Sequence, residues 1–236
     1  YVVNGQKIWT TFGHYSDWIF ALVRTDPEAK PKQAGIGFLL FDLDTPGVRV
    51  DPITTIAGDQ EFSQFFFEDV RVPAENMVGD PADGWRIANA VLSHERFKTG
   101  HPRHCFSALD RVKKVARATG AMEDDAFRDR LAGLEIDTLA SAALFDHAVE
   151  LTQAERPPGP SASIIKITST EKLQEIVDLL VEAAGGLGAG EGKIQTPEGA
   201  IDIHDLYMQC RHETIRGGSS EIMRNIVAKR GLGLPS

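Results

Sequence analysis

Apolar and polar residues alternate over the first third of the chain with the short period of β-strands. The expected strands cover residues 17–24, 34–42, 48–53 and 64–72. Before them, apolar residues flank Asn4-Gly5, a dipeptide favoured in two-residue hairpins, so we expect a tight turn there. The pattern ends at Val72-Pro73, because a residue before proline is restricted to extended backbone. These runs predict a β-rich domain over residues 1–75.

A helical period replaces the strand pattern near residue 84. Trp85, Ala88, Leu92 and Glu95 are spaced i, i+3, i+7 and i+10, so they share one side of a helix. Glu95 is therefore a carboxylate on an otherwise apolar stripe. Such a group costs free energy when buried unless it is partnered or functional.

Four further helices are expected downstream. They cover residues 124–155, 161–184, 203–214 and 219–230. A proline-rich break precedes the second of them, and Ser161 or Ser163 is its expected N-cap. Residues 80–236 thus predict an up-down bundle of four or five helices, and the whole chain an α+β fold with a partial antiparallel β-domain.

Composition narrows the class of protein. The 236 residues suffice for one large or two small domains, and 42% of them are hydrophobic. The formal charge of −9 argues against nucleic-acid binding, and no apolar run approaches the ~20 residues of a membrane span. The only cysteines, Cys105 and Cys210, lack metal or disulfide spacing, which fits a reducing, cytoplasmic compartment. Because Tyr1 reads as mid-strand, we expect the natural N-terminus upstream.

Residues 215–230, Ile-Arg-Gly-Gly-Ser-Ser-Glu-Ile-Met-Arg-Asn-Ile-Val-Ala-Lys-Arg, resemble the C-terminal signature of the acyl-CoA dehydrogenases. Residues 1–11 resemble the strand after the family's flavin loop, residues 70–79 its exit from the β-domain, and Gly84-Trp85 the start of the next helix. The resemblance implies the second half of the middle β-domain followed by the C-terminal helical bundle, ~60% of a subunit. We expect this part alone to be inactive and aggregation-prone, because half a β-domain leaves open strand edges.

The resemblance also implies a reaction, the FAD-dependent α,β-dehydrogenation of an acyl-CoA thioester. A carboxylate removes the α-proton while the β-hydride moves to flavin N5. The electrons are then expected to pass to an electron-transfer flavoprotein, as in fatty acid β-oxidation in a bacterial cytoplasm. The subunit is expected in a homotetramer or an α2β2 heterotetramer.

Two alternatives to that function stay open. One is a non-catalytic partner subunit of a heterotetrameric acyl-CoA dehydrogenase, and the other is a flavin monooxygenase on the same fold. Residues 127–135 depart from the family's pattern, and the divergence resembles bacterial branches acting on dicarboxylic, branched or steroid side-chain thioesters, such as pimeloyl-CoA dehydrogenase-like proteins.

Trp9 and Thr11 are the flavin contacts that the resemblance implies near the isoalloxazine ring and N5. An indole shields a flavin edge from water, and a hydroxyl donates a hydrogen bond to N5. The alternative is a strand with Trp9 on its buried face and Thr11 chosen for β propensity.

Glu95 is the candidate catalytic base. The family position that often carries the catalytic glutamate is Gly217 here, and some members, including isovaleryl-CoA dehydrogenase-like ones, take the base from a Glu-Arg pair matching Glu95-Arg96. Burial is expected to raise the pKa of a carboxylate on this stripe toward the range of a general base. The alternative is that Glu95 pairs with Arg96 or another cation and only orders the helix.

Gly217 also has an implied role through its backbone, whose N–H helps bind the thioester oxygen in an oxyanion-hole arrangement. The alternative is a tight turn at Gly217-Gly218 that needs positive φ. The three residues that follow, at the start of a helix, are candidate contacts of the flavin adenosine diphosphate; helix capping alone explains the serines nearly as well. They are Ser219, Ser220 and Glu221.

Other candidate ligands come from weaker signals. A glycine-rich turn at a helix end resembles the family's contact with the flavin pyrophosphate of a neighbouring subunit; its residues are Gly185, Gly186 and Gly188. Arg128 or Arg130 is a candidate replacement for the family's basic flavin contact, since guanidinium suits phosphate. The candidate substrate contacts are Arg96, His101 and Arg103, for which a solvated helix end is the alternative.

Overall fold

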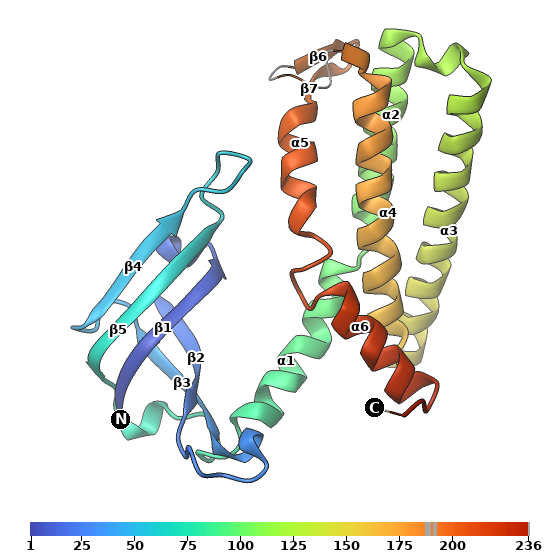
Figure 1. Ribbon diagram of the computed structural model, residues 1–236. Helices are drawn as coiled ribbons and strands as arrows, with labels where there is room; N and C mark the ends of the chain where they lie inside the picture. Colours follow the sequence, from blue (N-terminus) through green and yellow to red (C-terminus); the bar gives the residue numbers. More distant parts are fainter. Residues whose placement is uncertain (187–189, 191–192, 236) are drawn as a thin grey trace. The chain divides into compact units, whose positions relative to one another are not determined.

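A computed structural model describes residues 1–186, 190 and 193–235, without the side chains of Ser93, His94 and Arg96 (Figure 1). The chain divides into two compact units, Tyr1–Leu92 and Ser93–Ser236. The division falls inside helix α1 (Gly84–Thr99). Antiparallel sheets in the first unit and helices in the second confirm the expected α+β class.

Two antiparallel sheets build the first unit. A three-stranded sheet has the order β1-β5-β4, and β2 pairs with β3 in a second sheet. The strands are β1 (Val2–Thr11), β2 (Trp18–Arg24), β3 (Ile36–Asp42), β4 (Val48–Ile53) and β5 (Phe62–Arg71). Side chains of successive strand residues point to opposite faces. Phe65 and Phe67 are accordingly buried in the core, whereas the ring of Phe66 lies under the Arg49 guanidinium, 4.0 Å from its centroid.

The hairpin expected at Asn4-Gly5 is wrong, because β1 runs through that position as one strand. Its register against β5 shifts between Val3 and Gly5, as at a β-bulge. Asn4 bonds across the sheet instead of turning: its Oδ1 accepts from the Asp69 N–H at 2.8 Å, and its Nδ2 donates to Asp69 Oδ1 at 3.0 Å. Pairing with a strand more than 60 residues away therefore overrides the local turn preference.

An antiparallel bundle forms most of the second unit (Figure 1). Its helices are α2 (Arg103–Thr119), α3 (Asp125–Gln153), α4 (Ser161–Ala183), α5 (Ile203–Gln209) and α6 (Ser220–Ile226). Helix α4 is the centre, since it contacts each of the other four. Helix α2 and a hairpin of β6 (Lys193–Thr196) and β7 (Gly199–Asp202) were not among the predicted elements. Among the helices described, none has both the length and the apolar character to cross a membrane.

The helix starts follow two different rules. Asp124 caps α3 as the boundary predicts, accepting the Ala126 N–H at 2.9 Å. The expected serine cap of α4 is wrong. Its N-cap is Pro160, no side chain caps it, Ser161 is the first helical residue and Ser163 is buried. Proline provides the helical φ at this start, so a hydroxyl cap is not required for the turn to begin.

Candidate functional site

The end of α1 meets the turn between α5 and α6 at one close contact. Gly217 and Gly218 both have positive φ, +65° and +102°, as expected for a tight turn. A Cβ added to Gly217 would lie 2.9 Å from Thr99 Oγ1 and 3.3 Å from the Cβ and Cγ2 of Thr99. The turn therefore lies directly against the last residue of α1, and no side chain fits between them.

Glu95 is brought near this contact by helix geometry. It precedes Thr99 by four residues, so the two share one side of α1 about 6 Å apart along the axis. The structure leaves Glu95 exposed, and the burial expected from the apolar stripe is not observed. Periodicity groups residues on one face of a helix but does not report whether a neighbour covers that face. Thr99 itself was missed as a site residue, although its spacing from Glu95 is visible in the sequence.

Hydrogen bonds from α4 hold the chain before the turn. The Nε2 of Gln174 donates to the carbonyl oxygens of Cys210 and Arg211 at 3.1 and 3.2 Å. The Ser220 N–H closes the turn on the Thr214 carbonyl at 2.9 Å. The backbone that presents Gly217 is thus tied to the most buried helix of the unit.

Ser219 is the N-cap of α6, with its hydroxyl accepting from the Ile222 N–H at 3.4 Å. This confirms the capping interpretation of Ser219. Ser220 is buried at the first helical position, and Glu221 follows it in the first turn. Their contacts with a flavin diphosphate stay predictions.

Trp9 lies at a bulge near the end of β1. The register against β5 shifts between Lys7 and Thr10, and Trp9 has a left-handed φ of +66°, which is uncommon for a residue with a side chain. Its side chain is 61% exposed and meets the ring of Phe62 edge-on, with centroids 5.9 Å apart. The alternative that places Trp9 on a buried face is therefore wrong.

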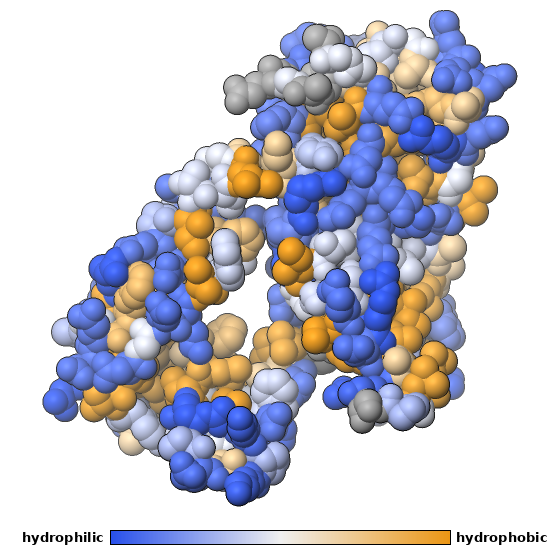
Figure 2. Space-filling view, viewed as in Figure 1, coloured by the Kyte–Doolittle hydropathy of each residue, from blue (hydrophilic) through white to orange (hydrophobic). Residues whose placement is uncertain are grey.

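The surface around Trp9 fits the ring system of FAD. Thr11 is exposed two residues after Trp9, and further apolar side chains reach the surface of this unit, seen in orange in Figure 2. They include Ile8 and Phe12. A flat indole with a hydroxyl beside it suits a planar, partly polar ring. Strained backbone at a residue with an exposed aromatic side chain is also typical of a binding site.

The glycine-rich candidate lies at the end of α4. Gly185 follows the C-cap and has φ +58°, so it ends the helix as a left-handed glycine, and Gly186 is exposed beside it. Gly188 lies outside the described residues. The helix-ending interpretation of this turn is confirmed at Gly185, and its pyrophosphate role stays a prediction.

Arg128 and Arg130 both carry ion pairs within the bundle. Arg128 pairs with Asp125 and donates to the Met122 carbonyl at 2.8 Å. Arg130 pairs with Glu182 at 2.8 Å. Both are exposed, so a phosphate would compete with these surface pairs, which are weak.

The candidate substrate contacts are placed only in part. His101 packs on the Phe145 ring, with centroids 4.5 Å apart, and its Nδ1 accepts from the Arg103 N–H at 3.1 Å. Burial, and secondarily the Arg103 charge, lowers the pKa of His101 below its usual value, so it is neutral at pH 7. Arg103 is exposed and supplies the charge of this group. The side chain of Arg96 lies outside the described part of the structure.

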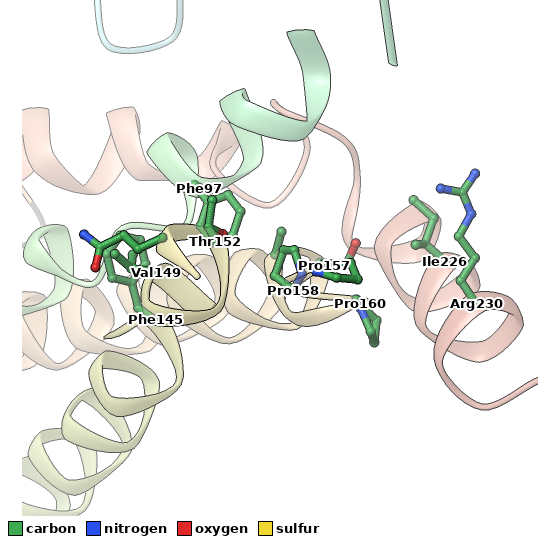
Figure 3. Close-up of a pocket in the computed structure, with 13 residues that line it drawn as sticks. Phe97, Phe145, Val149, Thr152, Pro157, Pro158, Pro160, Ile226 and Arg230 are labelled. Atoms are coloured by element: carbon green, nitrogen blue, oxygen red, sulfur yellow. The ribbon is translucent and has the colours of Figure 1, made fainter. Parts of the chain in front are cut away.

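A separate cavity of about 620 Å³ opens on the other side of α1 (Figure 3). Its apolar lining includes Phe97, Phe145 and Ile226. Phe97 follows Glu95 by two residues, or about 200° around the helix, so the two side chains leave α1 on nearly opposite sides. This cavity is therefore not the place where Glu95 would meet a substrate.

Comparison with known proteins covers the whole chain. The model of the acyl-CoA dehydrogenase C-terminal domain matches residues 82–232, and that of the middle domain matches residues 1–70. Acyl-CoA dehydrogenase IpdE1 of Mycobacterium tuberculosis is 37% identical over 238 residues, which cover 100% of this chain and 60% of that protein. FadE34 of the same organism is 34% identical over 236 residues, which cover 100% of this chain and 31% of that protein.

Solved structures show the same fold. The Tcur3481-Tcur3483 steroid ACAD superposes with a TM-score of 0.89 at 29% identity, covering 99% of this chain and 61% of that one. The ChsE4-ChsE5 complex of Mycobacterium tuberculosis gives a TM-score of 0.83 at 29% identity, covering 100% of this chain and 62% of that one. The chain thus spans about 60% of the length of IpdE1. Two successive family domains and these relatives agree on one conclusion: the chain belongs to the acyl-CoA dehydrogenase family.

Proposed function

We propose that the natural protein catalyses the FAD-dependent α,β-dehydrogenation of an acyl-CoA thioester. The observation that carries the proposal is the contact between Thr99 and Gly217. It supports a site in which a carboxylate, Glu95, stands one helical turn from Thr99, the residue that contacts the turn whose Gly217 N–H could bind a thioester oxygen. General-base and oxyanion groups at that spacing suit proton removal α to a carbonyl.

Each residue then has a defined task. Glu95 takes the α-proton, and the Gly217 N–H donates to the thioester oxygen as negative charge develops there. Trp9 covers one edge of the ring system, and the Thr11 hydroxyl donates a hydrogen bond toward N5. FAD, when bound, supplies the hydride acceptor. We assign the later electron acceptor to an electron-transfer flavoprotein.

Exposure of Glu95 in this chain bears on its role as a base. A fully solvated carboxylate is a weak general base, because water stabilises its ionised form. The proposal therefore requires substrate and cofactor to remove water from Glu95 when they bind. Catalytic contacts often tighten only in the complex.

For the acyl group we propose a steroid-derived thioester. The support is the likeness to the Tcur3481-Tcur3483 steroid ACAD, at 29% identity over 99% of this chain. A steroid side-chain thioester is accordingly the first substrate to compare with linear acyl-CoAs.

A second candidate function is that of a partner subunit without its own chemistry. Gly217 at the family's glutamate position favours it, as does the existence of two-protein assemblies such as the ChsE4-ChsE5 complex among similar structures. In that case the chain would complete an α2β2 heterotetramer rather than a homotetramer.

Flavin content and reduction separate these functions. The natural protein is purified alone and together with a co-expressed second subunit of the proposed heterotetramer. Each preparation is titrated anaerobically with linear and steroid side-chain acyl-CoAs. Bound FAD that bleaches with one of them supports the dehydrogenase. Retention of FAD only in the presence of a second subunit, with flavin reduction independent of Glu95, would favour the partner-subunit role.

A further inference from the structure

Lys166 is a buried lysine in the second unit without a hydrogen-bond partner in the described part of the structure. It lies in the second turn of α4, its exposure is 0%, and its Nζ makes no hydrogen bond with any described residue. A buried ammonium without a partner costs free energy, so the fold would be more stable with an apolar side chain there. A functional role would explain why a buried ammonium is kept at this position.

Two of the three acidic residues that act on Lys166 form ion pairs with arginines. Glu213 binds Arg216 through both oxygens, at 2.7 and 3.0 Å, and its side chain is only 14% exposed. Glu171 binds Arg224 in the same way, at 2.7 and 2.9 Å. The third, Glu221, is exposed, so solvent screens its effect on the buried ammonium. The positive charge of Lys166 is therefore only partly compensated.

The backbone of Lys166 lies against the segment that makes the proposed oxyanion contact. A Cβ on Gly100 would lie 2.9 Å from the backbone N and Cα of Lys166, so the end of α1 packs on the lysine backbone. The preceding residue, Thr99, meets Gly217. Lys166 also interacts electrostatically with Glu213 and Arg216, which lie in the segment leading into Gly217. Thr99 and Gly100 thus connect the backbone of Lys166 to the turn.

We propose that Lys166 is a positioning residue for the oxyanion contact, whose partly compensated buried charge raises the electrostatic potential at the Gly217 turn. This inference rests on the proposed function. Negative charge grows on the thioester oxygen as the α-proton leaves, and a fixed cation nearby favours that state over the ground state. The Gly217 N–H makes the contact, and Lys166 acts through the turn without touching the substrate.

Replacement by a neutral side chain of similar length separates this role from a structural one. Lys166→Met removes the charge and keeps the buried stem. We expect the flavin reduction rate at saturating acyl-CoA to fall on the order of tenfold. The apparent Kd for the substrate and the FAD content should be preserved, and the urea midpoint should not fall, because the buried ammonium is removed. Lys193→Met, at an exposed lysine of the distant β6 strand, is the matched control and should behave as wild type.

A second measurement uses the protonation of Lys166. Burial lowers the pKa of Lys166 below its usual value of 10.5. The charge of Arg216 also lowers this pKa, whereas the charges of Glu213, Glu171 and Glu221 raise it. The wild-type reduction rate should therefore decline as pH rises toward that pKa, because the charge is lost. Lys166→Arg keeps its charge at all these pH values, so its alkaline decline should be absent.

The outcomes are distinct. Equal reduction rates in Lys166→Met and wild type would overturn the inference, as would a wild-type rate that stays flat to pH 10.5. If Lys166→Met fails to fold, the wild-type and Lys166→Arg pH profiles decide alone. No flavin reduction in wild type by any acyl-CoA would instead overturn the proposed function and this inference with it.

Discussion

Substitution of Gly217 by alanine tests the packing on which the site depends. Alanine introduces a Cβ where φ is +65° and where Thr99 already occupies the space. The left-handed backbone costs about 1–2 kcal/mol for a residue with a Cβ. Crowding adds about 1–3 kcal/mol, because three atoms of Thr99 lie between 2.9 and 3.3 Å from the new carbon. We expect a loss of about 2–5 kcal/mol in unfolding free energy if the turn stays in place.

The turn has an alternative, which is to move away from α1. Movement relieves the crowding but shifts the N–H of residue 217, and a shift of 1 Å lowers the reduction rate on the order of 100-fold. Urea unfolding of the natural protein, followed by circular dichroism, and anaerobic flavin reduction together report both effects. A variant that loses neither stability nor rate would contradict the observed contact.

Two companion variants make the result specific. Gly133→Ala adds a Cβ to α3 with nothing within 4 Å, so it should stabilise the protein by about 0.5–1 kcal/mol. Thr99→Ala combined with Gly217→Ala removes the Oγ1 and Cγ2 contacts while Thr99 Cβ, at 3.3 Å, remains. The double variant should recover about 1 kcal/mol relative to the sum of the single changes. Strict additivity would show that Thr99 and Gly217 do not touch.

Trp9→Gly should leave the unfolding free energy within about 1 kcal/mol of wild type, because relief of the left-handed strain offsets the lost contact with Phe62. FAD should nevertheless dissociate faster from the variant, as measured by flavin fluorescence. A large drop in the unfolding free energy would contradict this prediction. Cys105 is buried, and burial raises its pKa to about 12 from 9.0. The folded state then holds the thiol proton more tightly than the unfolded state, so stability should fall as pH rises from 9 toward 12. At pH 8, thiol reagents should modify Cys105 only in urea, and rapid labelling of the native protein would refute its burial.

Periodicity and chain-breaking residues predicted the elements that local sequence determines. Strand β4 has the predicted bounds, and α3 begins at Asp125, one residue after the predicted start. The errors arise where contacts with residues distant in sequence determine the local structure. Asn4-Gly5 has the composition of a hairpin turn, but pairing with β5 stabilises an extended strand with a bulge. The β6–β7 hairpin was missed because its strands have only four residues each, too few for a period to stand out.

The candidate site likewise combines residues that the sequence predicted with contacts that only the structure reveals. The family motif directed attention to Gly217, and helical spacing puts Glu95 on the side of α1 that carries Thr99. Neither signal reveals that Thr99 touches Gly217, because the two are more than 100 residues apart in sequence. The exposure of Glu95 and the left-handed Trp9 also depend on tertiary packing rather than on local pattern. Lys166 drew no attention in the sequence, since lysine in a helix is ordinarily solvated.

The central claim is that Glu95 removes the α-proton, and anaerobic bleaching of the flavin tests it most directly. The absorbance near ~450 nm, the usual flavin band, is followed in the natural protein, in Glu95→Gln, and in Glu198→Gln as an exposed control. We predict that the acyl-CoA that bleaches wild type and the control leaves Glu95→Gln oxidised, with FAD still bound. Equal bleaching in all three proteins would contradict the account and assign the base to another residue.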